Sequence, residues 1–138
     1  MKWSVEVLTH VQFGIMSPFE RLDAFHECHR LALLTYRITM RWPAEEKYGI
    51  VSQIRRAAFS AAANIVEGSC RRGAAEFARF LSIAHSSLGE VEYCIRFAKD
   101  LGYLDGVDLD EIQKQRATAG ALTWRLYEAL ARSARRKK

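Results

Sequence analysis

The strongest restriction on the fold of this 138-residue chain is that it contains no proline after Pro43. Proline interrupts helices, because its ring clashes with the preceding turn and it has no amide hydrogen to donate. The same region also lacks any long alternation of β-branched and polar residues of the kind that strands require. The sequence therefore predicts long helices and no β-sheet.

The clearest of these predicted helices follows Gly73. Its apolar residues recur at alternating spacings of four and three, which places them along one seam of a helix. The seam comprises Phe77, Leu81, Ala84, Leu88, Val91, Ile95 and Ala98. A second apolar stripe beside it comprises Phe80, Ile83, Ser87, Cys94, Phe97 and Leu101. So wide an apolar surface must be covered on two sides.

Similar periodicity predicts three further helices, over about residues 22–41, 45–68 and 108–134. Four long helices joined by short links favour an all-α fold, an antiparallel up-down-up-down four-helix bundle. We expect one bundle domain over residues 19–134. A disordered or irregular N-terminal extension over residues 1–18 precedes it, and a basic C-terminal tail over residues 135–138 follows it.

The predicted helix over residues 45–68 combines small apolar residues, with Gly49 inside it, and a polar stripe. Its alanines allow another helix to approach closely, and Gly68 is expected to end it. The stripe contains Gln53, Asn64 and Glu67. Asn64 falls on the apolar seam, where a buried amide without a hydrogen-bond partner costs about 1–3 kcal/mol. The stripe is either a polar functional site or a buried network that fixes helix register, and we favour the network.

Positive charge is concentrated towards the C-terminus. The net charge is +5, and residues 111–138 alone hold eight basic and two acidic side chains. Such a segment attracts polyanions without sequence preference. It is therefore either a solvated tail that keeps the protein soluble or a surface that contacts nucleic acid.

The three cysteines are widely spaced and form no Cys-x-x-Cys pair. An odd number of isolated cysteines is typical of free thiols in a reducing compartment. The first residues do not form a signal peptide, since Glu6 and His10 interrupt any apolar core, and no apolar run is long enough to cross a membrane. We therefore expect a cytoplasmic protein without membrane contact.

No set of residues in the sequence predicts catalysis or metal binding. His26 and His29 are three residues apart, but a metal site needs further ligands, and no HExxH motif accompanies them. His85 precedes Ser86 and Ser87, yet residues adjacent in a helix do not face one another. We expect no enzyme activity, no cofactor, no metal and no small-molecule substrate.

The last predicted helix carries more apolar surface than a small bundle needs. Beside its core-facing residues runs a second line that includes Trp124 and Tyr127. Aromatic surface of this kind often marks a subunit interface. We therefore expect a homo-oligomer in which Trp124 and Tyr127 are candidate interface residues.

Several segments resemble motifs of one bacterial family of four-helix bundles. The first is Phe19–Phe25, and a central group comprises residues 46–50, 53–58 and 63–68. Residues of the third predicted helix also match: Arg72, Glu76, Phe77, Phe80, Leu81, Ile83, Ala84, Ser87 and Leu88. Over residues 19–104 the chain resembles the 23S rRNA intervening-sequence protein family. Two positions depart from the family pattern: alanine replaces a proline that is usual within residues 60–63, and Phe25 stands where tryptophan is common.

This resemblance implies a left-handed four-helix bundle that assembles as a homopentamer and has no known catalytic activity. Relatives with the same fold are accessory proteins of diversity-generating retroelements, which bind nucleic acid and a reverse transcriptase through basic surfaces. The partners implied for this chain are therefore further copies of itself, RNA or DNA, and a reverse transcriptase.

The candidate nucleic-acid contacts are basic residues of two regions. Arg55, Arg56, Arg71, Arg72 and Arg79 lie in the region of resemblance, and Arg132, Arg135, Arg136, Lys137 and Lys138 lie near the C-terminus. Arg55 and Arg56 are expected to face outward. Because aromatic residues do not alternate with these cations, we expect contact with the phosphate backbone rather than base-specific binding. The leading hypothesis is a non-enzymatic, oligomeric RNA-binding protein; the alternatives are a protein-interaction scaffold and an accessory factor of a reverse transcriptase.

Overall fold

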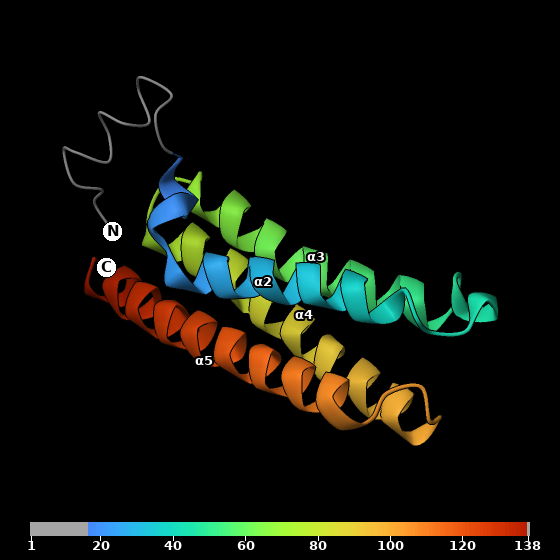
Figure 1. Ribbon diagram of the computed structural model, residues 1–138. Coiled ribbons are helices and arrows are strands. Elements are labelled where there is room, and N and C mark those ends of the chain that lie inside the picture. Colours follow the sequence, from blue (N-terminus) through green and yellow to red (C-terminus); the bar gives the residue numbers. More distant parts are fainter. Residues whose placement is uncertain (1–16, 138) are drawn as a thin grey trace.

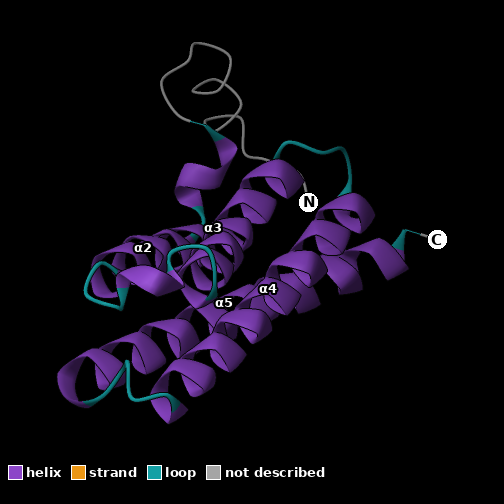
Figure 2. Ribbon diagram, turned by 90° about the vertical axis from the view of Figure 1, so that its right-hand side faces the viewer, coloured by secondary structure: helices purple, strands orange, loops and turns teal. Residues whose placement is uncertain are grey.

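The computed structural model describes residues 17–137, which form four antiparallel helices (Figure 1). The helices are α2 (Asp23–Thr39), α3 (Ile50–Ser69), α4 (Ala74–Asp100) and α5 (Gly106–Arg136), with short 3-10 helices η1 (Pro18–Arg21) and η2 (Ala44–Glu46). No strand occurs within the described range (Figure 2). Each long helix packs against two others, in the cyclic order α2, α3, α4, α5. The predicted all-α, up-down-up-down four-helix bundle is confirmed.

The core seam predicted for α4 is confirmed at every position. Its seven residues, from Phe77 to Ala98, are each no more than 3% exposed. The second stripe is only partly buried: Phe80 and Cys94 lie in the interior, whereas Phe97 and Leu101 are 43% and 49% exposed. Within residues 17–137, the neighbouring helices therefore do not fully cover the second stripe towards the C-terminal end of α4.

Helix α3 begins later than the sequence predicts. Gly49, expected inside the helix, precedes it with φ −104° and ψ −119°, outside the helical region. Glu45 and Glu46 belong to the separate turn η2. The prediction of a continuous helix from Glu45 is therefore wrong, because glycine permits a backbone conformation that interrupts it.

Gly68 does not end α3, which continues to Ser69. Gly68 is buried, and a Cβ atom there would lie 2.8 Å from Phe80 Cβ and 3.0 Å from Phe77 Cδ1. The residue therefore allows the backbone of α3 to approach α4 closely. Close approach of a neighbouring helix is confirmed, whereas the prediction of a helix-ending glycine is wrong.

The ends of the bundle differ slightly from the predicted domain limits. The predicted N-terminal extension lies outside the described part of the chain except for residues 17 and 18, and Pro18 starts η1. Arg135 and Arg136 belong to the last turn of α5 rather than to a separate tail. The folded part therefore extends beyond residues 19–134 at both ends.

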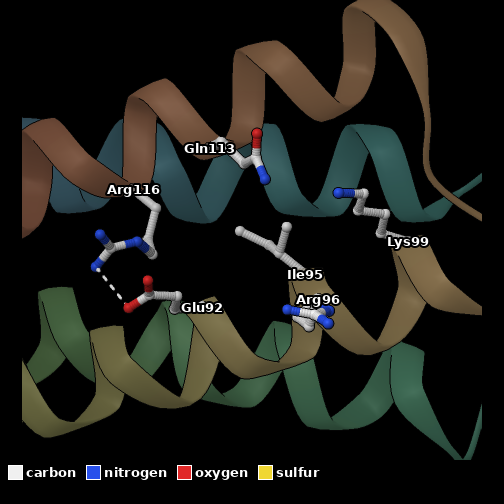
Figure 3. A pocket seen from close by; sticks show the side chains of 6 residues that line it. All are labelled: Glu92, Ile95, Arg96, Lys99, Gln113 and Arg116. Atoms are coloured by element: carbon white, nitrogen blue, oxygen red, sulfur yellow. Dashed lines mark ion pairs between the residues drawn. The ribbon is translucent and has the colours of Figure 1, made fainter.

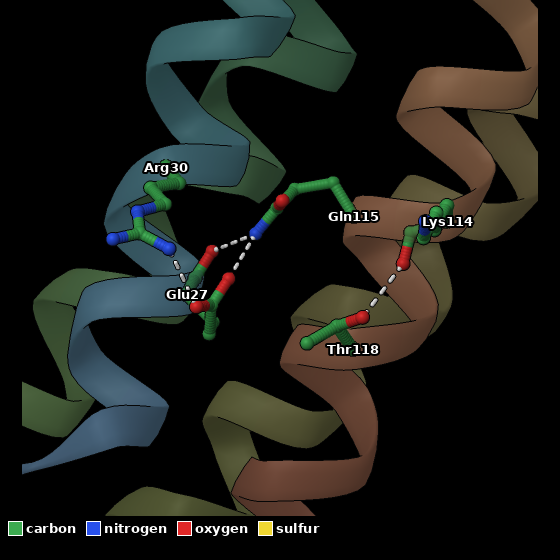
Figure 4. Close-up of polar contacts among 5 residues, drawn as sticks. All are labelled: Glu27, Arg30, Lys114, Gln115 and Thr118. Atoms are coloured by element: carbon green, nitrogen blue, oxygen red, sulfur yellow. Dashed lines mark hydrogen bonds and ion pairs between the residues drawn. The ribbon is translucent and has the colours of Figure 1, made fainter.

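Polar contacts fix α5 against α2 (Figure 4). The amide nitrogen of Gln115 donates to the Glu27 carbonyl oxygen at 3.0 Å and to Glu27 Oε2 at 2.6 Å. Arg30 donates to the other carboxylate oxygen of Glu27 at 2.8 Å. Because Gln115 and Glu27 are half-buried, these bonds set the relative position of the two helices.

Candidate nucleic-acid interface

The antiparallel arrangement brings distant basic residues to one end of the bundle. The C-terminus of α3, the N-terminus of α4 and the C-terminus of α5 all lie there (Figure 1). The predicted contact residues at this end are Arg71, Arg72, Arg79, Arg132, Arg135, Arg136 and Lys137. We call this group the basic end. Lys138, the last predicted contact, lies outside the described residues.

Two arginines of the basic end are held by an aromatic ring and by acidic partners. The guanidinium carbons of Arg71 and Arg79 lie 5.1 and 4.5 Å from the Phe80 ring centroid. Arg71 also donates to Glu67 at 2.7 Å, and Arg79 donates to Glu76 at 2.9 Å. The hydrogen bond from Arg79 lowers the pKa of the Glu76 carboxyl. Both arginines are therefore oriented, but part of their charge is neutralised.

Within residues 17–137, the remaining cations of the basic end have no acidic partner. Arg72, Arg132, Arg135, Arg136 and Lys137 are exposed, and none of them forms an ion pair with another residue of the described range. All but Arg72 come from the last turns of α5 and the residue after it. These five side chains supply the positive charge that a polyanion can approach directly.

Arg55 and Arg56 do not belong to the basic end. Arg55 is half-buried: its Nε donates to Thr39 Oγ1 at 2.9 Å, and its guanidinium carbon lies 4.4 Å from the Tyr36 ring centroid. The prediction of an outward-facing Arg55 is therefore wrong, because its side chain packs against α2. Arg56 is exposed and donates to Gln53 Oε1 at 2.6 Å. Of the pair, only Arg56 is open to a ligand.

The polar stripe of α3 does not form one buried network. Gln53 and Glu67 are exposed and accept hydrogen bonds from nearby arginines, so their predicted place in a polar core is wrong. Asn64 is half-buried and donates to the carbonyl oxygen and the hydroxyl of Ser60 at 2.8 and 3.0 Å. The Ser60 hydroxyl lies 3.0 Å from the Ser87 hydroxyl on α4. The predicted network is thus reduced to one polar contact between α3 and α4.

Comparison with known protein families identifies the family of this chain. The family model described as "23S rRNA-intervening sequence protein" matches residues 20–124, which include α2, α3, α4 and more than half of α5. The chain belongs to the 23S rRNA-intervening sequence protein family. The family expected from the sequence motifs is therefore confirmed. No curated protein matches the chain.

In this member of the 23S rRNA-intervening sequence protein family, His26 and His29, from which no metal site was expected, contact other protein groups. His26 Nε2 lies 2.7 Å from the Glu20 carbonyl oxygen, and His29 stacks on Phe25 with 5.7 Å between ring centroids. Within residues 17–137, no three His, Cys, Asp or Glu side chains are grouped so that they could hold a metal ion. Every helix in that range is too short or too polar to traverse a lipid bilayer.

The sequence did not predict a groove between α4 and α5. Two hollows of about 310 and 330 Å³ lie next to one another, because both are lined by Glu92 and Arg116. The first is also lined by Ile95, Arg96, Lys99 and Gln113 (Figure 3), and the second by His85, Gly89, Ala117, Gly120, Ala121 and Trp124. We call the two hollows together the α4–α5 groove.

The aromatic residues predicted at a subunit interface lie at one end of this groove. Trp124 is 45% exposed and packs against both His85 and Tyr127 with tilted rings, with 5.1 Å between ring centroids in each pair. The assignment of Trp124 and Tyr127 to a subunit interface stays a prediction. The pairing of His85 with Trp124 places Gly89 near Gly120, and because this pairing depends on the register of two helices, no sequence signal would have located the groove.

Proposed function

We propose that the protein is a non-enzymatic, cytoplasmic RNA-binding protein that assembles with copies of itself, a pentamer being the expected state. The observation that carries the proposal is the basic end, where cations from distant parts of the sequence meet. Membership of the 23S rRNA-intervening sequence protein family supports the same interpretation. In this proposal the protein holds RNA and leaves its bonds intact.

Binding at the basic end is electrostatic. Arg72 and the four cations of α5 project into solvent without acidic partners in the described range. A protein that neutralises phosphates releases condensed counterions, so its affinity falls linearly with salt concentration on logarithmic axes. If each of the five cations meets one phosphate, the slope of that line is about −4.

A salt series with charge variants tests this proposal. Fluorescence anisotropy measures binding of a labelled, structured RNA to the wild type and to the triple variant R132Q/R135Q/R136Q. The control R37Q/K47Q/K114Q removes the same charge from exposed positions nearer the opposite end. We expect the basic-end variant to weaken binding and to reduce the magnitude of the slope by about 3, with a smaller change in the control. Absence of binding at low salt, or an equal loss in both variants, would contradict the proposal.

Self-assembly is supported by apolar surface that the bundle leaves uncovered. A groove of about 450 Å³ between α3 and α4 is lined by apolar side chains that include Ile50, Tyr93 and Phe97, and Tyr93 is 65% exposed. Light scattering during size-exclusion chromatography measures the assembled mass. We expect the mass of a pentamer for the wild type and a smaller mass for F97S. An assembled protein that binds no RNA would instead favour the protein-interaction scaffold.

A further inference from the structure

The α4–α5 groove combines positive charge with an exposed aromatic ring. Arg96, Lys99 and Arg116 line it against the single acidic residue Glu92. Lys99 forms no ion pair within the described range, and Arg96 donates to Asp100 at 3.0 Å. A cationic groove beside a stacking ring is the arrangement with which proteins bind single-stranded nucleic acid.

Arg116 is positioned between the two hollows. Its side chain is 20% exposed, and one guanidinium nitrogen lies 3.8 Å from Glu92 Oε2. The same nitrogen lies 3.2 Å from the position that a Cβ atom on Gly120 would occupy, so a larger residue there would displace it. Figure 3 shows this guanidinium directed towards Glu92 and away from Lys99. Its charge therefore sits beside Gly120, within the groove.

The spacing between this charge and the ring suits one nucleotide. Trp124 follows Gly120 by four residues, which is about 6 Å of rise along α5. A phosphate at Arg116 and a base against Trp124 are separated by a similar length. His85 packs against Trp124 with its ring tilted by 48° and supports the indole at the edge of the groove.

Gly89 marks space that the protein does not fill. It lies inside the 27-residue helix α4, where glycine is less favourable than alanine. A Cβ atom there would meet no neighbouring group of the described residues within 4 Å, so packing does not require the glycine. Gly89 and Gly120 line the same hollow. The missing side chain of Gly89 leaves the backbone of α4 open to a ligand, whereas Gly120 is buried next to Arg116.

We propose that the α4–α5 groove binds a nucleotide of single-stranded RNA, with its phosphate at Arg116 and its base stacked on Trp124. Lys99 and Arg96 lie further along the groove and meet the phosphate of the neighbouring nucleotide. The inference rests on the proposed RNA-binding function and adds a second contact region to the basic end. It assigns Trp124 to the nucleic acid rather than to a subunit interface.

Glu92 has two effects in this arrangement. Without ligand it holds Arg116 in the groove, and with ligand it opposes the phosphate because both are negative. Its side chain is 67% exposed, so it can turn to solvent when RNA binds. The variant E92Q is therefore expected to bind single-stranded RNA severalfold more tightly than the wild type.

The test compares groove variants with matched controls. The probe is a labelled single strand of about 12 adenosines and uridines, a length within typical single-strand site sizes. W124A, R116Q and G89Q alter the ring, the charge and the open space, respectively. Their controls F59A, R125Q and S86Q make similar changes at exposed positions outside the groove. The thermal unfolding midpoint and the assembled mass are measured for every variant. G89Q is expected to retain its fold, because glutamine is more favourable than glycine within a helix.

We expect W124A to weaken binding by about 5- to 150-fold, the range for loss of one stacked base. R116Q is expected to weaken it by at least about tenfold, as for a lost charge-assisted hydrogen bond. G89Q is expected to weaken it because its side chain occupies the groove. If one nucleotide is sufficient for binding, adenosine 5′-monophosphate displaces the labelled strand. If only the unlabelled strand displaces it, the site requires an RNA chain. Both results support a nucleotide site.

Three results would overturn the inference. In the first, W124A and G89Q bind the strand like the wild type while R132Q/R135Q/R136Q does not; the groove is then excluded and the basic end remains. In the second, W124A lowers the assembled mass, which returns Trp124 to the subunit interface. In the third, neither the wild type nor any variant binds RNA, and the proposed function fails together with the inference.

Discussion

Helix α4 meets its two neighbours in opposite ways. Against α3 the contact is so close that a Cβ atom on Gly68 would lie 2.8 Å from Phe80 Cβ. Between α4 and α5 lies the α4–α5 groove. A Cβ atom on Gly89 would meet no neighbouring group of the described residues within 4 Å there. Packing therefore requires glycine at position 68, and does not require it at position 89.

The close contact at Gly68 contributes to the stability of the bundle, whereas the open space at Gly89 is available to a ligand. At Gly68 the α3–α4 contact uses glycine to reach interior packing density, whereas near Tyr93 the same two helices leave the groove of about 450 Å³. The α4–α5 contact forgoes some packing, and the groove it leaves carries Lys99, which has no ion pair within residues 17–137, beside the paired Arg96 and Arg116. Substitutions at the first contact should change the free energy of unfolding, whereas substitutions in the groove should leave it nearly unchanged.

The largest effect is expected at the core seam that both contacts share. Leu88 is fully buried and directly precedes Gly89. L88A removes apolar volume from the core and leaves a cavity, so we expect it to lower the free energy of unfolding by about 2–5 kcal/mol. Urea denaturation measures the change. The control S86A, at an exposed position on the same helix, should stay within about 0.5 kcal/mol of the wild type.

Thiol reactivity tests how tightly the α3–α4 contact covers Cys94, which lies beside the groove of about 450 Å³ between these helices. Cys94 is 4% exposed, and burial raises the pKa of its thiol from 9.0 to about 11. The fraction of Cys94 present as thiolate at neutral pH is therefore about 100-fold lower than for a thiol with the ordinary pKa. Burial also hinders access of the labelling reagent. We expect iodoacetamide to modify the exposed Cys70 long before Cys94, as followed by mass spectrometry of peptides. Equal labelling rates would show that the contact opens readily.

Replacing the buried glycine tests the close approach itself. G68A places a methyl group against Phe80 and Phe77, and such overpacking costs about 1–3 kcal/mol. Alanine returns up to about 1 kcal/mol through its higher helix propensity. Because the clash is with the rigid Cβ atom of Phe80, the cost lies towards the upper end of that range, and we expect a net loss of stability of about 1–2 kcal/mol in urea denaturation. Unchanged stability would mean that α3 and α4 separate without cost.

The smallest predicted effect has the opposite sign. G89A adds a methyl group in open space, so only helix propensity changes. We expect the free energy of unfolding to rise by up to about 1 kcal/mol, measured under the same conditions as for G68A. A loss of stability at this position would contradict the comparison, because it would show that Gly89 is required by packing.

The sequence predicted those parts of the fold that depend on periodicity within one helix. The heptad seam of α4 specifies which face is buried regardless of what covers it. Gly49 and Gly68 were assigned wrongly because glycine is used for an interrupted backbone and for close packing alike, and the sequence alone does not distinguish these uses. The prediction that Arg55 faces outward was wrong, because the surroundings of this side chain depend on where α2 lies.

The candidate site could be predicted only in part. Basic residues near the C-terminus are visible in the composition, but their meeting with Arg71, Arg72 and Arg79 depends on the antiparallel fold. The α4–α5 groove depends on the register between two helices, which brings His85 to Trp124 across 38 intervening residues. No local pattern contains that register, since it is set by side-chain packing between the helices.

The position of the basic end also determines how the molecule approaches a partner. Acidic residues from Asp100 to Glu111 surround the turn between α4 and α5, at the opposite end of the bundle. This separation gives the described part of the chain a permanent electric dipole moment along its long axis. The field of a polyanion therefore rotates the bundle before contact, and encounters occur with the positive end leading. The association rate constant gains from this alignment, and added salt removes the gain without altering any contact in the fold.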